Sequence, residues 1–571
     1  MSHTYLRDPD RSISEGPPLA LEAGLGTLTL SGFLAEVTAR FADREALVHT
    51  DDRGEVERWS YSDLWQQSMA VARSLLATGL SRGERVGILM TNRAEFLSAT
   101  FGVALAGGVA TPISTFSTPT ELDYLLSLSA VSVLLFEGQV LKQNFAEQLC
   151  ALEVAVAESA PGALRSLRFP YLRRLARVDS VHTEGAIESW SDFLSHGDST
   201  APAFVEHCAN QVQPADPGVL FFSSGSTAKP KGIVSAHRGV SVQMWRMGSQ
   251  QALDDGVRSW TANGFFWSGN FAMIVGGTLG RGGSLVLQRT FHADEALQLM
   301  ARERVTFLFS WPHQWEQLIA SPEFATVDLS SLVHLDPNTP IAQHPTVNTS
   351  WLQPTYCYGN TETFTLSTGF PANTTKEAAN DSHGLPFPGN TIKIVDPLTG
   401  EILPLGGRGE IAVKGPTLML GYLGVPLDDS LDAQGFFRTG DGGWLDEHGR
   451  LYWEGRLNDI IKTGGANVSP FEIDEAIMKD AAVRLSHTVG VPHESLGEMV
   501  VSCLVLHAGF ERDEDAVRAQ LKSVLASYKI PRRVLFFSAD ELSVTGSAKV
   551  KSADVRALAE QTLLTEDQGP S

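Results

Sequence analysis

The sequence predicts an α/β protein whose large amino-terminal domain holds two helix-covered, mainly parallel sheets. Apolar, strand-like runs alternate with helical patterns: the run 85–90 precedes a helical pattern at 95–105, and the pattern 121–128 precedes the run 131–136. Strands that alternate with helices pair in parallel and carry the helices on their faces. With 571 residues the chain is too long for one ordinary core, and this length favours about two to four domains.

A small β subdomain is expected in the second half of the chain. The section 385–422 is rich in Gly and Pro, and its apolar runs are short, as at 392–395 and 409–413. Short runs between frequent turn residues indicate β structure. We therefore expect a small β-barrel-like subdomain over about residues 385–457.

The character of the sequence changes again after Arg456. Ser469 and Glu472 match a capping box, and Pro470 suits a first helical turn, so a helix is expected to begin there. These features predict an amino-terminal domain over residues 1–457 and a small α+β carboxyl-terminal domain over residues 458–571. The join between them is a candidate hinge.

Composition and charge limit the classes of function. The net charge of −22 opposes a nucleic-acid partner, because phosphate groups would be repelled over most of the surface. The four cysteines are far apart and form no CxxC pair, so neither a zinc site nor a disulfide framework is expected. Residues 1–18 are too polar for a signal peptide. The uncharged run 96–120 contains Gly and Pro and predicts a buried helix, a strand and a turn rather than a membrane span. We therefore expect a soluble, cytoplasmic protein without a transmembrane segment.

The most informative segment joins an apolar strand to a loop of hydroxyl groups, glycine and lysine. It runs from Phe221 to Gly232 and contains Lys229 and Lys231. Hydroxyls and backbone amides beside glycine donate to phosphate oxygens, and lysine supplies positive charge. No Gly-Lys-Ser/Thr closes the segment, so it is not a Walker loop that opens a helix. It predicts a phosphate-binding loop, and an ordinary polar loop between two strands is the alternative.

Three further motifs follow in order along the chain. The first, at 358–362, contains an aromatic ring, a glycine, a hydroxyl and a carboxylate. The second has an acid on a Gly-containing turn at 437–441 and is followed by the segment 454–462. The third is a Thr-Gly-Ser segment with two lysines at 543–551. Together with the loop, these motifs resemble the adenylate-forming superfamily, which contains acyl-CoA synthetases, firefly luciferases and the adenylation domains of peptide synthetases. The resemblance covers nearly the whole chain and is closest to the acyl-CoA synthetases.

The resemblance implies a role for each matching position. For ATP and AMP it implies contacts from Ser223, Ser224, Gly225, Ser226, Thr227, Lys231, Asn338, Tyr358, Gly359, Asn360, Thr361, Asp441 and Arg456. Tyr358 would stack on adenine, and Asp441, supported by Arg456, would bind the ribose hydroxyls. The implied magnesium ligands are Glu362 and Thr227. The implied catalytic residues are Lys549, Lys231, Thr361 and Glu362.

The resemblance also implies that the carboxyl-terminal domain is mobile. In this family the domain rotates after adenylation, which withdraws the catalytic lysine and admits a thiol. Asn458 occupies the hinge position, where the family has Asp or Lys. On the coenzyme A side the resemblance implies Lys462, Gly464 and Gly465.

A group of arginines lies between residues 165 and 177. Its members are Arg165, Arg168, Arg173, Arg174 and Arg177. They favour a solvated helix face, and contact with the phosphates of a bulky acceptor such as coenzyme A is the alternative.

Four aromatic side chains are candidates for the lining of an acid pocket, namely Trp267, Phe271, Trp311 and Trp315. Trp267 stands where many acyl-CoA synthetases have a histidine near the acid. An apolar acid suits such a lining. Because one methylene changes binding in an apolar pocket by only about 1–3 kcal/mol, fatty, branched, alicyclic and aromatic acids all remain open.

The sequence departs from the family pattern at three places. Ala228 replaces a loop glycine, and Ala548 replaces the glycine before Lys549, which leaves Lys551 as the fallback lysine. The segment 336–340 replaces a Gly-Gly-Ala-Pro strand end beside adenine and the acid. Bulkier residues there are expected to reshape the pocket.

These expectations combine into one functional hypothesis: an ATP-dependent carboxylic acid:CoA ligase that works through an acyl-adenylate, with ATP and coenzyme A as co-substrates and Mg²⁺ as cofactor. The first alternative is an adenylate-forming ligase with a non-CoA acceptor, such as an amide or ester synthetase. The second is a non-catalytic nucleotide-binding homologue. Each motif residue has a structural alternative when taken alone, such as a core position for Tyr358 or a surface position for Glu362. The oligomeric state stays open, with a homodimer as one option.

Overall fold

The computed structural model describes most of the chain in two compact units. The described residues are 6–7, 10–51, 54–223, 230–352, 356–459, 461–463, 466–493, 496–522, 524–525, 529–539, 541–542 and 552–567. The first unit contains Met1–Arg7, Ser14–Ile392 and Val413–Phe437, and the second contains Asp8–Ile13, Lys393–Ala412 and Arg438–Ser571. The domain boundary between residues 457 and 458 stays a prediction.

The first unit contains an eight-stranded sheet. Its strand order is β11 (Ile187–Ser189), β10 (Arg174–Arg177), β7 (Val133–Phe136), β5 (Arg85–Leu89), β6 (Val109–Pro112), β12 (Pro217–Ser223), β13 (Lys231–Ala236) and β22 (Gly421–Tyr422). Strands β11 to β12 pair in parallel, whereas β13 is antiparallel to both of its neighbours. The runs predicted at 85–90 and 131–136 are therefore the neighbouring parallel strands β5 and β7.

A second, five-stranded sheet of the first unit is also mainly parallel. Its order is β16 (Phe307–Phe309), β14 (Arg258–Thr261), β15 (Ser284–Val286), β3 (Glu45–Thr50) and β4 (Val56–Ser60), and only β4 is antiparallel to its neighbour. A small antiparallel sheet contains β17 (Cys357–Tyr358), β18 (Thr368–Gly369) and β19 (Leu385–Pro386). A further pair is formed by β8 (Gln139–Val140) and β9 (Gln143–Asn144). The prediction of two mainly parallel sheets is confirmed.

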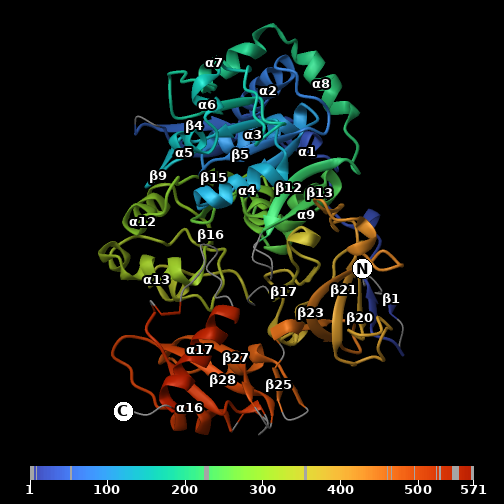
Figure 1. Ribbon diagram of the computed structural model, residues 1–571, viewed down its shortest axis with the longest axis vertical. Helices are drawn as coiled ribbons and strands as arrows, with labels where there is room; N and C mark the ends of the chain where they lie inside the picture. Colours follow the sequence, from blue (N-terminus) through green and yellow to red (C-terminus); the bar gives the residue numbers. More distant parts are fainter. Residues whose placement is uncertain are drawn as a thin grey trace. The chain divides into compact units, whose positions relative to one another are not determined.

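Several helices share the largest hydrophobic core of the first unit with both large sheets, and four of them, labelled in Figure 1, supply most of its helical residues. They are α1 (Leu30–Arg40), α2 (Tyr61–Ala77), α3 (Ala94–Leu105) and α9 (His237–Gln250). Every residue of α3 except Glu95 is buried, which agrees with a helix that is apolar on all sides. The uncharged run 96–120 is thus most of α3, then β6 and the start of α4, as the Gly and Pro residues predicted. No helix in the described part of the chain is both long and apolar enough to cross a membrane.

The outer faces of the two sheets carry their own helices. Helices α4 (Pro119–Ser129) and α5 (Phe145–Leu152) contribute to a core with β5, β7 and β10, and α12 (Ala293–Arg302) and α13 (Pro312–Ala320) contribute to a core with β14, β15 and β16. The other α-helices in the described part of the first unit are α6 (Ala155–Glu158), α7 (Trp190–Ser195), α8 (Pro202–Gln211), α10 (Ser268–Asn270), α11 (Gly277–Gly280) and α14 (Lys376–Ala379), and the π-helical η3 (Phe271–Gly276) lies between α10 and α11.

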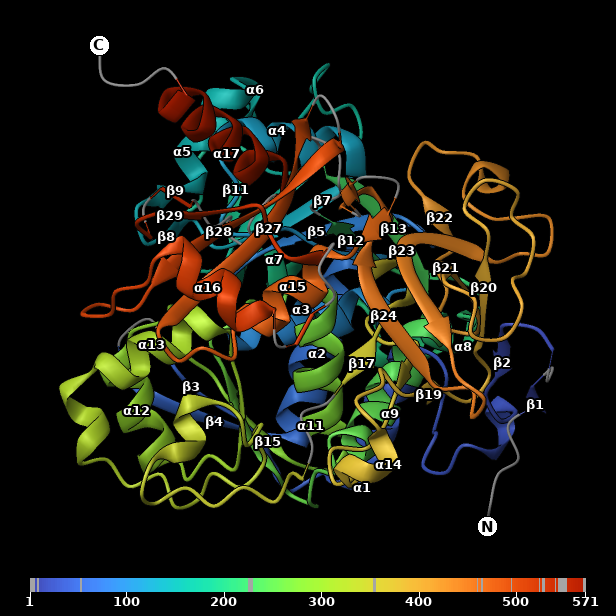
Figure 2. The same cartoon turned by 90° about the horizontal axis from the view of Figure 1, so that it is seen from below.

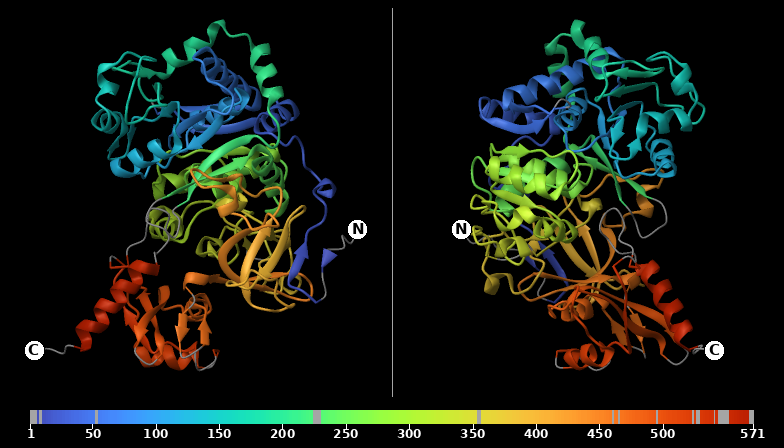
Figure 3. Two further views of the ribbon diagram at one scale, coloured as in Figure 1. Left: turned by 45° about the vertical axis from the view of Figure 1, so that its right-hand side comes forward. Right: turned by 90° about the vertical axis from the view of Figure 1, so that its left-hand side faces the viewer.

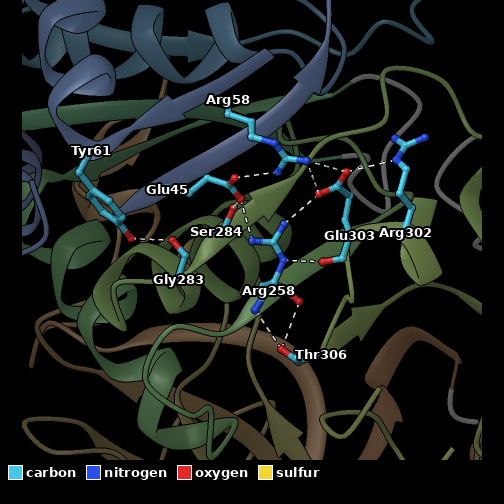
Figure 4. Close-up of polar contacts among 9 residues, drawn as sticks. All are labelled: Glu45, Arg58, Tyr61, Arg258, Gly283, Ser284, Arg302, Glu303 and Thr306. Atoms are coloured by element: carbon cyan, nitrogen blue, oxygen red, sulfur yellow. Dashed lines mark hydrogen bonds and ion pairs between the residues drawn. The ribbon is translucent and has the colours of Figure 1, made fainter. Parts of the chain in front are cut away.

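A polar network joins the amino ends of β14, β15 and β3 (Figure 4). Glu45 accepts hydrogen bonds from Arg58 and Arg258 at 2.7 Å and from Ser284 at 2.6 Å. Glu303 accepts from Arg58 Nη2 at 3.0 Å and from Arg258 Nη2 at 3.1 Å. Because Glu45, Arg258 and Ser284 are the first residues of their strands, the network lies at the edge opposite to the carboxyl ends of these parallel strands.

Most of a six-stranded sheet belongs to the second unit. Its order is β1 (Leu6–Arg7), β2 (Ile13–Glu15), β20 (Thr391–Val395), β21 (Gly409–Lys414), β23 (Phe437–Leu445) and β24 (Leu451–Arg456), and Figure 3 shows the blue amino-terminal strands beside the yellow and orange ones. The sheet curls into an antiparallel half-barrel. It confirms the predicted β-barrel-like subdomain and adds amino-terminal strands that the sequence did not predict there.

The carboxyl-terminal part of the second unit is an α+β structure. Its sheet contains β25 (Ile461–Thr463), β26 (Ala466–Val468), β27 (Val483–His493), β28 (Gly497–Leu506) and β29 (Arg533–Phe536). Side chains of β28 alternate between two cores: Val500 and Leu504 pack with α15 (Pro470–Ile477) and α16 (Glu514–Leu521), whereas Val501 and Cys503 pack with α17 (Ser552–Asp567). The helices therefore cover both faces of this sheet (Figure 2).

The capping box predicted at Ser469 is wrong, although α15 begins at Pro470 as expected. The Ser469 hydroxyl makes no capping bond and donates to the carbonyl of Glu454 instead. Glu472 forms an ion pair with Lys529 at 2.6 Å. Both side chains of the expected box therefore have tertiary partners, which a local sequence pattern does not reveal.

Candidate active site

The predicted phosphate-binding loop joins two antiparallel strands. Ser223 at the end of β12 pairs with Lys231 at the start of β13. The loop positions Ser224, Gly225, Ser226, Thr227, Ala228 and Lys229 lie outside the described residues. A strand follows the loop, which agrees with the exclusion of a Walker loop. The Ser223 hydroxyl, at the base of the loop, is buried and has no hydrogen-bond partner among the described residues.

Three side chains of the first unit meet beside this hairpin. Tyr422 on β22 donates from its hydroxyl to Glu362 Oε1 at 2.7 Å. The Lys231 Nζ lies over the Tyr422 ring, 4.8 Å from its centroid. Backbone bonds support the arrangement, because the amide of Met419 donates to the carbonyl of Glu362 at 2.7 Å and that of Leu423 to Gly232 at 2.8 Å. The structure thus groups a lysine and a carboxylate that are 131 positions apart, through one tyrosine.

The motif 358–362 is a strand followed by a tight turn. Tyr358 ends β17 and is 5% exposed. A Cβ atom on Gly359 would lie 2.1 Å from the carbonyl oxygen of Thr365, so only glycine fits. Asn360 caps the short 3-10 helix Thr361–Thr363 (η6), accepting from the amide of Thr363 at 3.0 Å. Glycine and the capping side chain therefore fix the backbone that presents Thr361 and Glu362.

The turn continues through two residues with left-handed backbone angles. Phe364 has φ 47° and Thr365 has φ 89°. Neither residue is a glycine, and such positions cost on the order of 1–3 kcal/mol each, so they persist only where the surroundings hold them. The turn beside Glu362 is therefore strained, and its neighbours decide its shape.

Burial keeps the thiol next to this motif protonated. It raises the pKa of Cys357 to about 12. The nucleophilic thiolate form of Cys357 is therefore scarce near neutral pH.

Asp441 and Arg456, the pair predicted to bind the ribose, lie side by side on two strands of the half-barrel. Asp441 on β23 lies opposite Arg456 on β24, and Arg456 Nε lies 3.0 Å from Asp441 Oδ1. The Asp441 amide donates to the Thr439 hydroxyl at 3.1 Å, and Arg456 Nη1 donates to the Thr439 carbonyl at 3.0 Å. Asp441 is 4% exposed. The guanidinium thus orients the carboxylate, and its role in nucleotide binding stays a prediction.

The segment that departs from the family pattern forms a compact turn. The Asn338 amide donates to Asp336 Oδ1 at 2.8 Å, and the Thr339 hydroxyl donates to the Asp336 carbonyl at 2.8 Å. Burial raises the pKa of Asp336, and the hydrogen bond from Asn338 opposes this shift only in part. The segment therefore holds a partly desolvated carboxyl where relatives have small residues.

The four candidates for the acid pocket have different surroundings. Phe271 is fully buried in the large core, 6.2 Å from the Phe221 ring. Trp267 is partly buried and precedes α10, Trp311 is 44% exposed, and Trp315 packs against the core beneath α12 and α13. Their shared pocket role stays a prediction, and the burial of Phe271 and the exposure of Trp311 make these two the weakest members.

The segment around Trp267 is fixed by polar contacts at the carboxyl ends of parallel strands. Asn92, after β5, donates to the carbonyl of Asn263, after β14, at 2.8 Å. Glu137, after β7, accepts from Arg289, after β15. The two large sheets of the first unit are therefore tied together at the edge where α/β proteins bind ligands.

The predicted hinge and coenzyme A residues are described only in part. Asn458 lies in the short 3-10 helix Leu457–Asp459 (η8), and its side chain lies outside the described residues. Lys462 on β25 is exposed, and its amide donates to Glu498 at 2.8 Å. Gly464, Gly465, the catalytic candidate Lys549 and the fallback Lys551 lie outside the described residues.

The arginine group between 165 and 177 does not form a helix face, so that interpretation is wrong. Its members lie in a loop and on β10. Arg168 pairs with Asp123, Arg173 with Glu84, Arg174 with Glu188 and Arg177 with Asp179. Carboxylates thus already neutralise these four arginines, which weakens the alternative of a site for acceptor phosphates.

Of the two implied magnesium ligands, only Glu362 lies within the described residues. No cluster of three or more His, Cys, Asp or Glu side chains that could hold a metal is found in the described part of the chain. Mg²⁺ is usually bound by one or two carboxylates together with substrate phosphates. Glu362 directs Oε1 to Tyr422 and is partly exposed, so it suits such a role. Thr227, the second implied ligand, lies outside the described residues.

Sequence reasoning missed two residues of this site, Tyr422 and Gln243. Tyr422 contacts the cluster through β22, a short strand that pairs with β13. Gln243 on α9 donates to the backbone of the strained turn. Neither residue belongs to a motif. The only signal for Gln243 is its spacing of three positions from Arg246, which places both on one helix face.

Comparison with known proteins identifies the family of the chain. Residues 34–423 match the family described as AMP-binding enzyme, and residues 472–549 match the AMP-binding enzyme C-terminal domain. The chain is 27% identical over 562 residues to the medium-chain acyl-CoA ligase ACSF2, mitochondrial, of Danio rerio, covering 94% of this chain and 89% of that protein. It is 26% identical to the putative acyl-CoA synthetase YngI of Bacillus subtilis, and the match covers 92% of this chain and 96% of that protein. The fold is similar to that of ATP-bound MatB from Rhodopseudomonas palustris, with a TM-score of 0.74 and 24% sequence identity. The superposition covers 93% of this chain and 99% of that structure. The family match covers more than half of the chain, and the chain therefore belongs to the AMP-binding enzymes of the adenylate-forming superfamily.

Proposed function

We propose that the chain is an ATP-dependent carboxylic acid:CoA ligase that forms AMP, an acid-thiol ligase acting on an apolar acid. The observation that carries the proposal is the grouping of Lys231, Tyr422 and Glu362 at the mouth of the β12–β13 hairpin. A lysine beside a hydroxyl-rich loop suits a triphosphate, and a nearby carboxylate suits its metal ion. The similarity to acyl-CoA ligases along nearly the whole chain supports coenzyme A as the acceptor.

The first step activates the acid. An oxygen of the carboxylate attacks the α-phosphorus of ATP, the bond to the β-phosphate oxygen breaks, and pyrophosphate leaves. Both reactants are anions, so positioning and charge neutralisation dominate the catalysis. A lysine about 4 Å from a phosphate oxygen contributes on the order of 4 kcal/mol of gross attraction at an intermediate dielectric, before desolvation is subtracted. Lys231 and Lys549 are the residues proposed to supply this charge.

Magnesium, when bound, neutralises charge on the phosphate oxygens. Glu362 and Thr227 are the residues proposed to hold it. Asp441, oriented by Arg456 at 3.0 Å, is proposed to accept hydrogen bonds from the ribose hydroxyls. Tyr358 is proposed to stack on adenine.

The second step transfers the acyl group. The thiolate of coenzyme A attacks the acyl carbonyl carbon, the bond to the phosphate oxygen breaks, and AMP leaves. The exposed Lys462 and the two glycines after it are proposed to lie on the coenzyme A side. Rotation about the hinge at Asn458 is proposed to admit the thiol.

One experiment tests both steps. The purified protein is incubated with ATP, Mg²⁺ and a panel of fatty, branched, alicyclic and aromatic acids, with and without coenzyme A, and pyrophosphate, AMP and thioester are measured. We expect acid-dependent pyrophosphate release and a thioester only when coenzyme A is present. A reaction without acid serves as the control for simple ATP hydrolysis.

The rival functions give different results in the same assay. An amide or ester product formed without coenzyme A would replace the acceptor that we propose. Absence of acid-dependent pyrophosphate release over the whole panel would favour a non-catalytic nucleotide-binding protein. The panel also identifies the acid.

A further inference from the structure

We infer that Gln243 is a positioning residue for adenylation: it holds the strained turn after Glu362 in the shape that presents Thr361 and Glu362 to the nucleotide. The inference rests on the proposed function for the roles of Thr361 and Glu362. The holding of the turn itself follows from contacts within the first unit.

Both donor positions of the Gln243 amide point at this turn. Nε2 donates to the carbonyl of Phe364 at 2.8 Å and to the carbonyl of Leu366 at 2.5 Å. The two carbonyls flank Thr365, so the amide bridges the part of the backbone that has left-handed angles at 364 and 365. Gln243 is 0% exposed, and water therefore does not replace these bonds in the folded protein.

The orientation of the Gln243 amide is set by a buried arginine. Arg246 Nη1 donates to Gln243 Oε1 at 3.4 Å. Two carbonyls require donors and the guanidinium requires an acceptor, so only one of the two amide orientations satisfies all three groups. The helix places both residues on one face, because they are three positions apart on α9.

Arg246 is itself held on several sides. Its Nε and Nη2 lie 2.7 Å from the two carboxylate oxygens of Glu22, and Nη2 also donates to the carbonyl of Pro388 at 3.1 Å. Its guanidinium lies over the Phe387 ring, 4.8 Å from the centroid. A continuous chain of contacts therefore runs from Glu22 through Arg246 and Gln243 to the turn.

The turn connects directly to the residues proposed for catalysis. The amide of Phe364 donates to the carbonyl of Thr361 at 3.1 Å, and the amide of Thr365 donates to the carbonyl of Asn360 at 2.9 Å. A change of backbone angle at 364 or 365 would break these bonds and shift the short helix that carries Glu362. Gln243 thus acts through the turn and touches no reacting group.

Hydrogen exchange tests the positioning role without relying on activity. Gln243→Met keeps the length of the side chain and removes both donors. We expect backbone amides in peptides covering 358–368 to exchange about tenfold faster in the full-length variant, because two buried hydrogen bonds are lost. The matched control is Gln251→Met, directly after the same helix: Gln251 is 2% exposed, and neither amide atom of its side chain has a hydrogen-bond partner among the described residues. The control is expected to exchange like the wild type.

Activity provides the second readout. Gln243→Met is expected to lower the rate of acyl-adenylate formation and to raise the Mg²⁺ concentration needed for half the maximal rate, each by about tenfold. Thioester formation from presynthesised acyl-adenylate should stay within about twofold of the wild type. A purely structural role would lower both half-reactions together and leave the Mg²⁺ dependence unchanged.

The outcomes separate this inference from the proposed function. Equal exchange in Gln243→Met and Gln251→Met would overturn the inference. If Gln243→Met does not fold, the variant Glu22→Gln, which weakens the contact between Glu22 and Arg246, takes its place. Backbone amide exchange about threefold faster in peptides covering 358–368 would support the inference. Unchanged exchange would overturn it. A wild-type protein that activates no acid would overturn the proposed function, while exchange would still decide whether Gln243 holds the turn.

Discussion

Tyr422 is the residue through which two charged groups of the candidate site are linked. Its hydroxyl donates to Glu362 at 2.7 Å, and its ring lies under Lys231. The tyrosine thus fixes the carboxylate with one end and faces the ammonium group with the other. Loss of a group that orients a metal ligand typically lowers metal affinity about 10–100-fold, and Glu362 is the proposed ligand.

Tyr422→Phe is expected to weaken magnesium-dependent adenylation. The change removes the hydroxyl that orients Glu362 and leaves the ring under Lys231 in place. We expect the Mg²⁺ concentration for half-maximal pyrophosphate exchange to rise about tenfold. Tyr452→Phe is the matched control, because Tyr452 also donates to a carboxylate, Asp446, at 3.3 Å. Equal Mg²⁺ dependence in the two variants would show that Tyr422 has no role in magnesium binding.

Asp441→Asn is expected to weaken ATP binding. The amide loses the charge that Arg456 supports and one acceptor for the ribose, and a hydrogen bond to a charged group is worth about 1.5–3 kcal/mol. We expect the KM for ATP to rise at least tenfold, with a smaller change in kcat, in pyrophosphate exchange. Asp446→Asn is the control, since Asp446 pairs with Arg450 at 2.7 Å at the turn of the same hairpin. An unchanged KM in Asp441→Asn would contradict the assignment.

At the scale of elements, the two ends of the parallel strands have different tasks. The amino ends of β3, β14 and β15 are joined by the network around Glu45 and Glu303, which Figure 4 shows. The carboxyl ends carry the segments that hold Trp267. We therefore expect the network of Figure 4 to act on stability and not on catalysis.

Glu45→Gln is expected to lower stability in a pH-dependent manner. Burial alone would raise the pKa of Glu45, but hydrogen bonds from Ser284, Arg58 and Arg258 hold it below its usual range. Because the folded pKa is lower than the unfolded value of about 4.3, the ionised group stabilises the fold above that pH. The stabilisation is lost as the pH falls through the folded pKa.

The measurement is the Tm of wild type and variant between pH 7 and pH 3.5. We expect a Tm about 2–4 °C lower for Glu45→Gln at pH 7, a difference that shrinks below about pH 4.5, and unchanged kcat and KM. Glu401→Gln, at an exposed position, serves as the control with an unchanged Tm. A Tm difference between wild type and Glu45→Gln that grows as the pH falls would contradict a lowered pKa of Glu45 in the folded protein.

At the scale of the whole molecule, the proposed mechanism requires a lysine that takes part in one step only. Lys549→Ala is expected to lower acyl-adenylate formation by at least about a hundredfold. It should leave thioester formation from presynthesised acyl-adenylate nearly unchanged, because the proposed rotation withdraws the lysine before the thiol reacts. Separate assays of the two half-reactions measure this.

Lys551→Ala distinguishes the two lysines of that segment. If Lys551 carries the role, its variant and not Lys549→Ala loses adenylation. Equal losses in both half-reactions of Lys549→Ala would contradict a step-specific role. Both positions lie outside the described residues, so their assignment remains a prediction from the sequence.

Local patterns predicted the elements well and the partners of side chains poorly. The runs at 85–90 and 131–136 became β5 and β7, and the helix after Ser469 began at Pro470. The capping box failed because Ser469 and Glu472 found partners at Glu454 and Lys529. The predicted helix face of arginines between 165 and 177 is wrong because these residues lie in a loop and on β10, and three of them pair with carboxylates from other segments.

The sequence by itself determined the order of elements and the motifs that name candidate residues such as Lys231, Glu362 and Asp441. Both follow from local physics, since apolar periodicity, glycine and hydroxyl groups act over a few neighbouring positions. Only the tertiary structure decided that Tyr422 joins Lys231 to Glu362 and that Gln243 holds the turn behind them. These contacts join residues from 60 to 191 positions apart, and such pairs meet only when packing of the sheets and helices brings their elements together.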